Sequence, residues 1–472
     1  MIATGKRIIS LVAIFCLAGC ASQRYTPAPI VPGAIATQYE SRSLSDPVLR
    51  AFEERNLGHS VSPWPPKSWD LQTLSLAGLY FNPTLDLARA RLATAEGAVV
   101  TASARPNPTF DLVPGVPAPF LLTQDFLFLI ETAGKRGRRV QIARNLDQTA
   151  QLDLADAAWS VVMGVRLALL NYLIASRNLE LLRAEEKIRE DQVSILEQSL
   201  LAGEITRLDV DLARIEASKT QVASRAAEGQ TAETKAALSA AVGVPVTGLE
   251  GADFSWPDLE TPPAPESLST DQIRRDAVVN RLDIRRSLAQ YAAAEAALRS
   301  EIAKQYPNLS IGPGYTYEER NSFFTVGVST ALPVFNRNQG PIAEAEGRRK
   351  EAAAAFLQTQ AQVIAKSERA LSVYEAALKE VAEAESLVQL QETRQQSIQQ
   401  TIRAGADSRL SLDGAQIQLS ILASARLDAL GRAQRALGDL EDAVQRPLDR
   451  DEVFQTPPES PALNPPSTGS KR

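Results

Sequence analysis

The sequence predicts a mainly α-helical fold with a small β part, in which one unit of helix, β-hairpin and long helical hairpin occurs twice. The phrase LAGEITRLDVDLARIE at 201–216 returns as RAGADSRLSLDGAQIQ at 403–418, and seven of the sixteen positions are identical. Residues 348–404 contain neither glycine nor proline, which is typical of one very long helix. Two stretches rich in aromatic residues, 106–130 and 306–335, contain the two-residue alternation that is typical of strands.

Residues 1–20 have the features of a bacterial lipoprotein signal peptide. Lys6 and Arg7 precede a ten-residue apolar run, which is too short to span a membrane permanently. The closing letters LAGC resemble a lipobox, which implies cleavage before Cys20, lipid on the Cys20 thiol and, because Ala21 follows, an outer-membrane location. The alternative is an ordinary signal peptide with an incidental cysteine.

Composition favours a folded protein without a catalytic site. Hydrophobic residues make up 44% and charged residues 22% of the chain, which suits a packed core. The net charge of −6 and the lack of a basic stripe predict no nucleic-acid partner. With His59 as the single histidine and two cysteines, few side chains can act as nucleophiles or metal ligands. We therefore expect no enzyme activity, no cofactor and no metal site.

Changes of composition divide the chain. Residues 21–69 are rich in proline, serine and threonine and are expected to form an extended arm, residues 246–269 a proline-rich linker, and residues 446–472 a disordered tail. Between them lie the two repeats, 70–245 and 270–445, which align at a nearly constant offset of 201 to 203 residues. So little drift indicates duplication of one structural unit.

Each repeat contains the same parts in the same order. A helix rich in alanine and leucine leads to strands, expected at about 108–131 and 308–335, and then to a long helix, a glycine turn and a returning helix. The 57 residues from 348 to 404 would reach ~85 Å as a helix, which indicates a coiled coil or a tube instead of a compact domain. Gly203 and Gly405 are placed at the turns, because glycine permits the positive φ that ends a helix.

The second β-hairpin has the clearer pattern. In LSIGPGYTY and FFTVGVSTALPV, apolar side chains occupy one face and small or polar side chains the other. Strands of ~10 residues match the span of a transmembrane barrel, with lipid on the apolar side and water on the other. Four strands cannot close a barrel, and exposed edges cannot lie in lipid, so a membrane location requires oligomerisation. An ordinary surface hairpin is the alternative, and Pro313 predicts a bulge or an edge position.

Four junctions carry a resemblance to a known family. ARPNPTF at 104–110 and KQYPNLS at 304–310 are similar to the helix-to-strand junctions of the TolC-like outer-membrane factors, or outer membrane efflux proteins. ETAGKRGRRVQIA at 131–143 and LPVFNRNQGPIAEAE at 332–346 resemble the strand-to-helix junctions, the latter in the wording typical of the cobalt-zinc-cadmium type heavy-metal efflux branch. The resemblance implies a homotrimer that forms a twelve-stranded outer-membrane β-barrel, continued by a periplasmic α-helical tube.

The resemblance also implies a function and partners. The protein would be the outer-membrane duct of a tripartite efflux pump, in contact with outer-membrane lipid, a periplasmic adaptor (membrane fusion) protein and an inner-membrane RND-type transporter. Its expected substrates are small, and the FNRNQG wording favours heavy-metal cations. Multidrug efflux and type I protein secretion are alternatives, as is a lipid-tethered periplasmic coiled-coil scaffold without a pore.

The repeated phrase contains the candidate site residues. By the resemblance, the two turns are the periplasmic tips, where the adaptor binds and the bore can close. Asp209 and Asp413 are candidates for a carboxylate ring at this aperture, although the second tip lacks the two aspartates, three apart, of better-studied members. The alternative is that both aspartates only stabilise helix starts. Candidate adaptor contacts are Gly203, Arg207, Leu208, Gly405, Arg409 and Leu410.

Overall fold

The computed structural model describes residues 25–116, 121–264 and 270–448. The predicted lipidation site Cys20 and the predicted tail beyond residue 448 lie outside the described residues. By its contacts the chain divides into two units, residues 1–42 and residues 43–472. The described part of the first unit contains the helix α2 (Pro32–Glu40).

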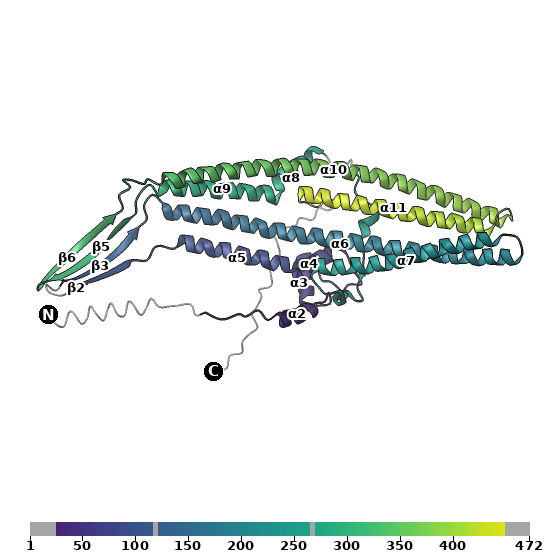
Figure 1. The fold of residues 1–472 in the computed structure, drawn as a ribbon, viewed down its shortest axis with the longest axis horizontal. Helices are drawn as coiled ribbons and strands as arrows, with labels where there is room; N and C mark the ends of the chain where they lie inside the picture. Colours follow the sequence, from purple (N-terminus) through teal and green to yellow (C-terminus); the bar gives the residue numbers. More distant parts are fainter. Residues whose placement is uncertain (1–24, 117–120, 265–269, 449–472) are drawn as a thin grey trace, which may run out of the picture. The chain divides into compact units, whose positions relative to one another are not determined.

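The second unit contains both repeats (Figure 1). The order of helix, β-hairpin and long helical hairpin is the same in each, which confirms the predicted duplication of the fold. The first part consists of α3 (Pro47–Leu57), β1 (Ser68–Trp69), α4 (Leu71–Phe81), α5 (Pro83–Ser103), β2 (Thr109–Gly115), β3 (Leu121–Ile130), α6 (Lys135–Leu201) and α7 (Arg207–Val242). The second part consists of η1 (Val246–Leu249), β4 (Asp253–Phe254), η2 (Pro257–Glu260), α8 (Thr270–Asn280), α9 (Leu282–Ala303), β5 (Leu309–Glu318), β6 (Asn321–Thr330), α10 (Gln339–Arg403) and α11 (Arg409–Val444).

The prediction of an extended arm is wrong for much of 32–57, where the chain forms α2 and α3. Pro32 and Pro47 stand at the start of these helices, where the missing N–H costs nothing and the fixed φ favours a helix. The Asp46 carboxylate caps α3, because it accepts a hydrogen bond of 2.8 Å from the N–H of Val48. Proline here marks the starts of helices.

The helices of the second unit lie side by side in a layer, with the strands at one end and the two helix–helix turns at the other (Figure 1). The two long helices, α6 with 67 residues and α10 with 65, contribute to both halves of the layer. Toward the strands the neighbours follow the order α5, α6, α9, α10; toward the turns the order is α7, α6, α11, α10. One edge of the layer is therefore formed by α5 and α7, and the other by α10.

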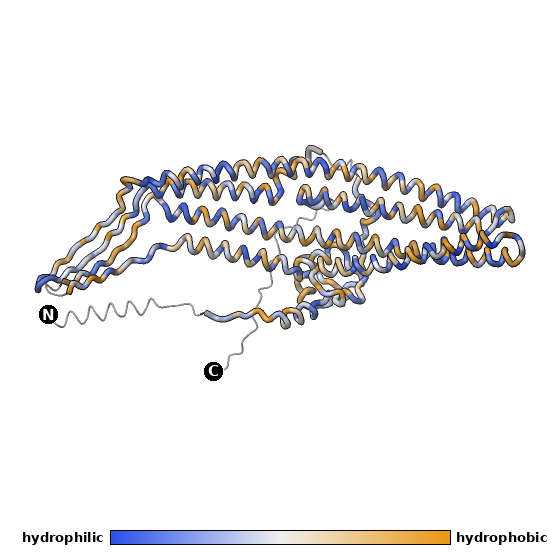
Figure 2. Tube along the Cα trace, viewed as in Figure 1, coloured by the Kyte–Doolittle hydropathy of each residue, from blue (hydrophilic) through white to orange (hydrophobic). Residues whose placement is uncertain are grey.

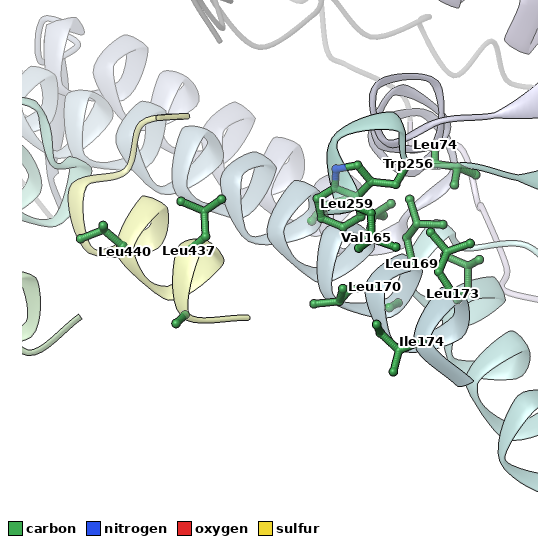
Figure 3. Close-up of a cluster of buried hydrophobic side chains, with 14 of the residues drawn as sticks. Leu74, Val165, Leu169, Leu170, Leu173, Ile174, Trp256, Leu259, Leu437 and Leu440 are labelled. Carbon is green, nitrogen blue, oxygen red and sulfur yellow. The ribbon is translucent and has the colours of Figure 1, made fainter. Parts of the chain in front are cut away.

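The main core lies where α6 meets α4, α11 and the segment that was predicted as a linker. That segment pairs with the chain ahead of α4, because β4 runs parallel to β1, with Trp69 opposite Phe254. Trp69 and Trp256 are both buried. Figure 3 shows Trp256 and its apolar neighbours around the middle of α6. These neighbours include Leu74, Val165, Leu169, Leu170, Leu173 and Leu259.

One helix of the described chain, α6, contains a stretch apolar enough to cross a membrane by length and composition. Half of that stretch is buried inside the protein, so packing in the core accounts for its apolar character. Figure 2 shows polar and apolar residues interleaved along the long helices, as expected for helices with one packed face and one exposed face.

The four long strands form one antiparallel sheet in the order β2-β3-β5-β6. Pro313 therefore lies neither on an edge strand nor at a bulge. The β3–β5 pairing is interrupted opposite 312–313 without an extra residue, since the register is the same on both sides of the gap. β6 ends at Thr330, so the predicted strand limit of 335 is wrong; Phe335 lies in the following loop and is 98% exposed.

Candidate functional site

Both helical tips are closed by the same glycine turn. Gly203 has φ of 77° and Gly405 has φ of 76°, the left-handed conformation that glycine adopts at low cost. In each turn two N–H groups donate to the last free carbonyls of the long helix, the arrangement known as a Schellman motif. These bonds run from Gly203 to Leu200 (3.0 Å), from Glu204 to Ser199 (3.0 Å), from Gly405 to Ile402 (2.9 Å) and from Ala406 to Thr401 (2.9 Å).

Asp209 stabilises the start of α7. Its Oδ2 accepts hydrogen bonds from the backbone N–H of Thr206 (2.9 Å) and from the Thr206 hydroxyl (2.6 Å). The Thr206 side chain and backbone thereby hold the pKa of the Asp209 carboxyl below its ordinary value. The side chain is exposed, so the capping role leaves its carboxylate in contact with solvent.

The second tip uses different residues for the same purpose. The Ser408 hydroxyl accepts from the N–H of Ser411 (3.3 Å), and the Asp407 carboxylate accepts from the N–H of Ser408 (2.8 Å). The capping carboxylate therefore precedes the helix here, whereas in the first tip it lies within the first turn of α7. The sequence analysis did not single out Asp407; an acidic residue directly before a Ser at a helix start was the available signal.

Asp413 lies away from the open end of the tip. Its residue is only 4% exposed, and its Oδ2 has no hydrogen-bond partner within the described parts of the chain. Burial raises the pKa of this carboxyl, Asp191 on α6 raises it further, and Arg409 opposes both effects. Asp413 is thus packed inside the protomer. In this conformation it does not present an exposed carboxylate at the tip.

The candidate adaptor contacts differ in exposure. The side chains of Arg207 and Arg409 are 85% and 68% exposed, and Leu208 is 66% exposed. Leu410 is half-buried. Beside the second tip a polar groove of about 570 Å³ lies between α10 and α11, and its lining includes Arg394, Asp407, Ser411 and Gln418.

The two faces of the sheet have opposite character. One face carries rows of apolar residues, of which Phe324, Val326 and Val328 are 86%, 73% and 63% exposed. Side chains that are directly paired across strands share a face. The other face is therefore defined by the row Asp111–Asp125–Gly314–Thr325 and by the pairs Thr109–Leu127 and Gly312–Gly327.

Asp111 and Asp125 face each other directly on this second face, a pair that the sequence analysis missed because it depends on the register of β2. Gly314 makes room for the row, since a Cβ at this position would collide with the side chains of Asp125 and Thr325. Two carboxylates and one hydroxyl of each protomer are thereby placed at one level of a face that otherwise carries mostly small or polar groups.

Both sides of the layer are open. Among the described strands, β2 and β6 have one paired neighbour each, so each has an edge with free backbone groups. On the α7 edge, four apolar side chains lie exposed at spacings of four, three and seven residues, which places them in one stripe along the helix. This α7 stripe consists of Leu208, Leu212, Ile215 and Val222, exposed by 66%, 54%, 52% and 71%.

No group of three or more His, Cys, Asp or Glu residues that could hold a metal ion is found in the described part of the chain.

Two known proteins match the chain over more than half of its length. The chain is 28% identical over 272 residues to the cobalt-zinc-cadmium resistance protein CzcC of Cupriavidus metallidurans, covering 57% of this chain and 63% of that protein. It is 25% identical to the pyoverdine export outer membrane protein OpmQ of Pseudomonas putida, covering 65% of this chain and 67% of that protein. The alignment thus spans less than two thirds of the length of CzcC.

Solved structures share the fold. The outer membrane protein VceC of Vibrio cholerae matches with a TM-score of 0.64 and 21% identity, covering 79% of this chain and 95% of that chain. CusC matches with a TM-score of 0.65 and 18% identity, covering 90% and 99%. The family model of the outer membrane efflux proteins matches residues 125–244 and 273–444, which together are more than half of the sequence. The chain therefore belongs to the outer membrane efflux protein family.

Proposed function

We propose that this protein is the outer-membrane duct of a tripartite efflux pump, through which small substrates leave the periplasm. The observation that carries the proposal is the sheet, with one apolar face, one small and polar face, and a free edge on each side. A free strand edge cannot lie in lipid, so the sheet must be closed by other copies. Three copies of four strands give a closed twelve-stranded barrel with lipid outside and water inside.

The two edges of the helical layer can be covered by neighbouring copies in the same way as the two edges of the sheet. The α7 stripe is apolar and exposed in the protomer, and α10 forms the opposite edge of the layer with Leu387 and Leu390, which are 51% and 68% exposed. Contact between α7 of one copy and α10 of the next would bury both edges and continue the barrel as a periplasmic tube. A homotrimer is the state in which sheet and helices close together.

The partners of this duct meet it at the helical tips. We propose that a periplasmic adaptor protein binds around the two glycine turns at Gly203 and Gly405. Arg207, Leu208 and Arg409 are exposed for this contact, and Leu410 is partly so. The polar groove between α10 and α11 adds a recess at the second tip. An inner-membrane RND-type transporter would drive transport, and lipid on Cys20 would anchor the chain to the outer membrane.

Heavy-metal cations are the proposed cargo. The relative CzcC is named for cobalt, zinc and cadmium resistance, and Asp111 and Asp125 put negative charge on the proposed inner face of the barrel. A pore favours cations through rings of acidic side chains without needing a tight binding site. The relative OpmQ is named for pyoverdine export, so an organic substrate is the second candidate.

Two measurements test these proposals. The purified protein in detergent should have the mass of a trimer and should conduct ions after reconstitution into planar bilayers. A monomer or dimer without conductance would instead favour the lipid-tethered scaffold.

The cargo is tested in the host. Deletion of the gene should sensitise cells to one or more of zinc, cobalt, cadmium, copper and nickel, with complementation by the wild-type gene as the control. Sensitisation to drugs and detergents alone would contradict metal efflux and favour the multidrug alternative. Lost export of a protein substrate would favour type I secretion.

A further inference from the structure

The second tip contains a buried carboxyl group to which the proposed duct assigns no role. Asp413 lies in the second turn of α11, 4% exposed, and its Oδ2 is buried without a hydrogen-bond partner among the described residues. In the ionised carboxylate, Oδ2 would lose its hydration and gain no donor among the described residues, which is costly. The protonated form does not have this cost, so the site favours a proton on Asp413.

The charges around Asp413 come from two helices. On α6, Asp191 is a like charge, and on α11 itself Arg409 is the opposite charge, one turn earlier. Arg409 is already engaged, since its Nη2 lies 3.6 Å from Oδ2 of Asp191 and links the start of α11 to α6. The third helix packed here, α10, contributes the uncharged Gln391, whose Nε2 donates to the carbonyl of Ala415 (2.8 Å), and Arg394, which lines the groove beside Ser411 and Gly414. Ionisation of Asp413 would therefore make it compete with Asp191 for one arginine.

The first tip shows that the repeated phrase alone does not bury this aspartate. Asp211, the counterpart of Asp413, is only half-buried and lies near two arginines, at 3.9 Å from Arg207 and 3.7 Å from Arg214. The position of Arg214 is occupied by Gln416 in the second copy. The same aspartate thus lies near two arginines in one tip, whereas in the other it is buried and its Oδ2 has no hydrogen-bond partner among the described residues.

We propose that Asp413 is a proton-dependent brace, which holds the start of α11 against α6 when protonated and releases it when ionised. The contact is most stable at low pH and is lost as the pH rises through the raised pKa of this carboxyl. If the protein is the proposed duct, on which this consequence rests, release of α11 widens the periplasmic end, so conductance increases with pH.

Hydrogen exchange tests the brace directly in the full-length trimer. Protection factors, corrected for the intrinsic effect of pH, should fall by about tenfold or more at residues 409–416 as the pH rises through the transition. D413N should abolish this transition and stay protected, because the amide cannot ionise. D211N, the matched change in the first tip, should retain it. A flat wild-type profile, or a D413N profile like that of the wild type, overturns the proposal.

Two further variants identify the charges involved and guard against a folding defect in D413N. D191N removes the like charge and should move the transition to lower pH, whereas R409Q removes the favourable charge and should move it to higher pH. Shifts in the same direction, or none, overturn the brace.

Conductance separates the brace from the proposed function. Channels with constant conductance over this pH range, together with flat exchange, overturn the brace and leave the duct intact. A pH-dependent exchange transition in a protein that never conducts supports the brace and contradicts the duct.

Discussion

The two copies of the repeated phrase form the same turn in two different surroundings. Gly203 and Gly405 differ by one degree in φ, and the hydrogen bonds that close the two turns agree within about 0.1 Å. Beyond the turns the copies diverge. Ile215 is 52% exposed, whereas its counterpart Ile417 is 8% exposed. Asp211 lies between two arginines, whereas Asp413 is buried without a partner for its Oδ2 within the described residues.

The cause is the position of each helix in the layer. α11 lies between α6 and α10, whereas α7 packs on α6 along its length and touches α4 only near its end. The repeated phrase therefore determines the local turn, and the neighbours determine burial. The α7 stripe is apolar like the buried face of α11, so we infer that α7 also has a neighbour in the working protein, supplied by a second copy.

The largest expected effect is on assembly. Replacing Leu212 and Val222 of the α7 stripe with glutamate should give a folded monomer, because the two side chains are exposed in the protomer and charge cannot be buried between copies. Native mass spectrometry and circular dichroism measure the two properties. As a control, Gln221→Glu adds a charge at an exposed position of α7 away from the stripe and should leave the trimer intact. A trimer of the stripe variant would show that α7 is not an interface.

The second effect concerns the fold of the protomer. In the monomeric stripe variant, Ile417→Ala should lower the free energy of unfolding by about 2–5 kcal/mol, because it leaves a cavity between packed helices. Ile215→Ala in the same background should change it by about 0.5 kcal/mol or less. Urea unfolding followed by circular dichroism measures both. Equal losses would mean that the α7 edge is already covered within one chain.

The third effect concerns the two β-hairpins, which also differ between the copies. The first contributes two aspartates to the inner row, and the second contributes Gly314 and Thr325. Asp111→Asn with Asp125→Asn should lower the permeability of cations relative to anions severalfold, since it removes six carboxylates from one level of the proposed trimeric barrel. Reversal potentials in a salt gradient measure this ratio. Thr325→Val, in the same row, should not change it, and an unchanged ratio in the aspartate variant would place that face outside the lumen.

These contrasts show how far the sequence could predict the structure. Glycine turns, long helices and alternating strands depend on local chemistry. The turns at Gly203 and Gly405 and the second β-hairpin could therefore be predicted from the sequence alone. The helices at Pro32 and Pro47 were missed, because proline is equally suited to an extended segment and to the first turn of a helix.

The rest depended on contacts between distant segments. The pairing of Asp111 with Asp125 requires the register of β2 against β3. The burial of Asp413 requires α6, more than 200 residues away in sequence, since Asp191 and Asp413 are 222 positions apart. The sequence alone placed Asp209 and Asp413 together as a possible ring, and only tertiary packing separates the exposed cap from the buried brace.

The smallest effect is also the sharpest test of the difference between the tips, because the two aspartates should respond to pH in opposite directions. The pKa of Asp209 is lowered by its hydrogen bonds to Thr206, so its contribution to the start of α7 is present above the ordinary pKa and is lost as the pH falls through the lowered one. Falling pH should therefore loosen residues 206–213, whereas rising pH should loosen 409–416. Hydrogen exchange corrected for intrinsic rates measures both segments in one sample. Asp209→Asn should remove the loosening of the first tip at falling pH and leave the loosening of the second tip at rising pH unchanged. If both tips loosened in the same direction, the repeated phrase would control their electrostatics after all, and the position of each helix in the layer would not explain the difference.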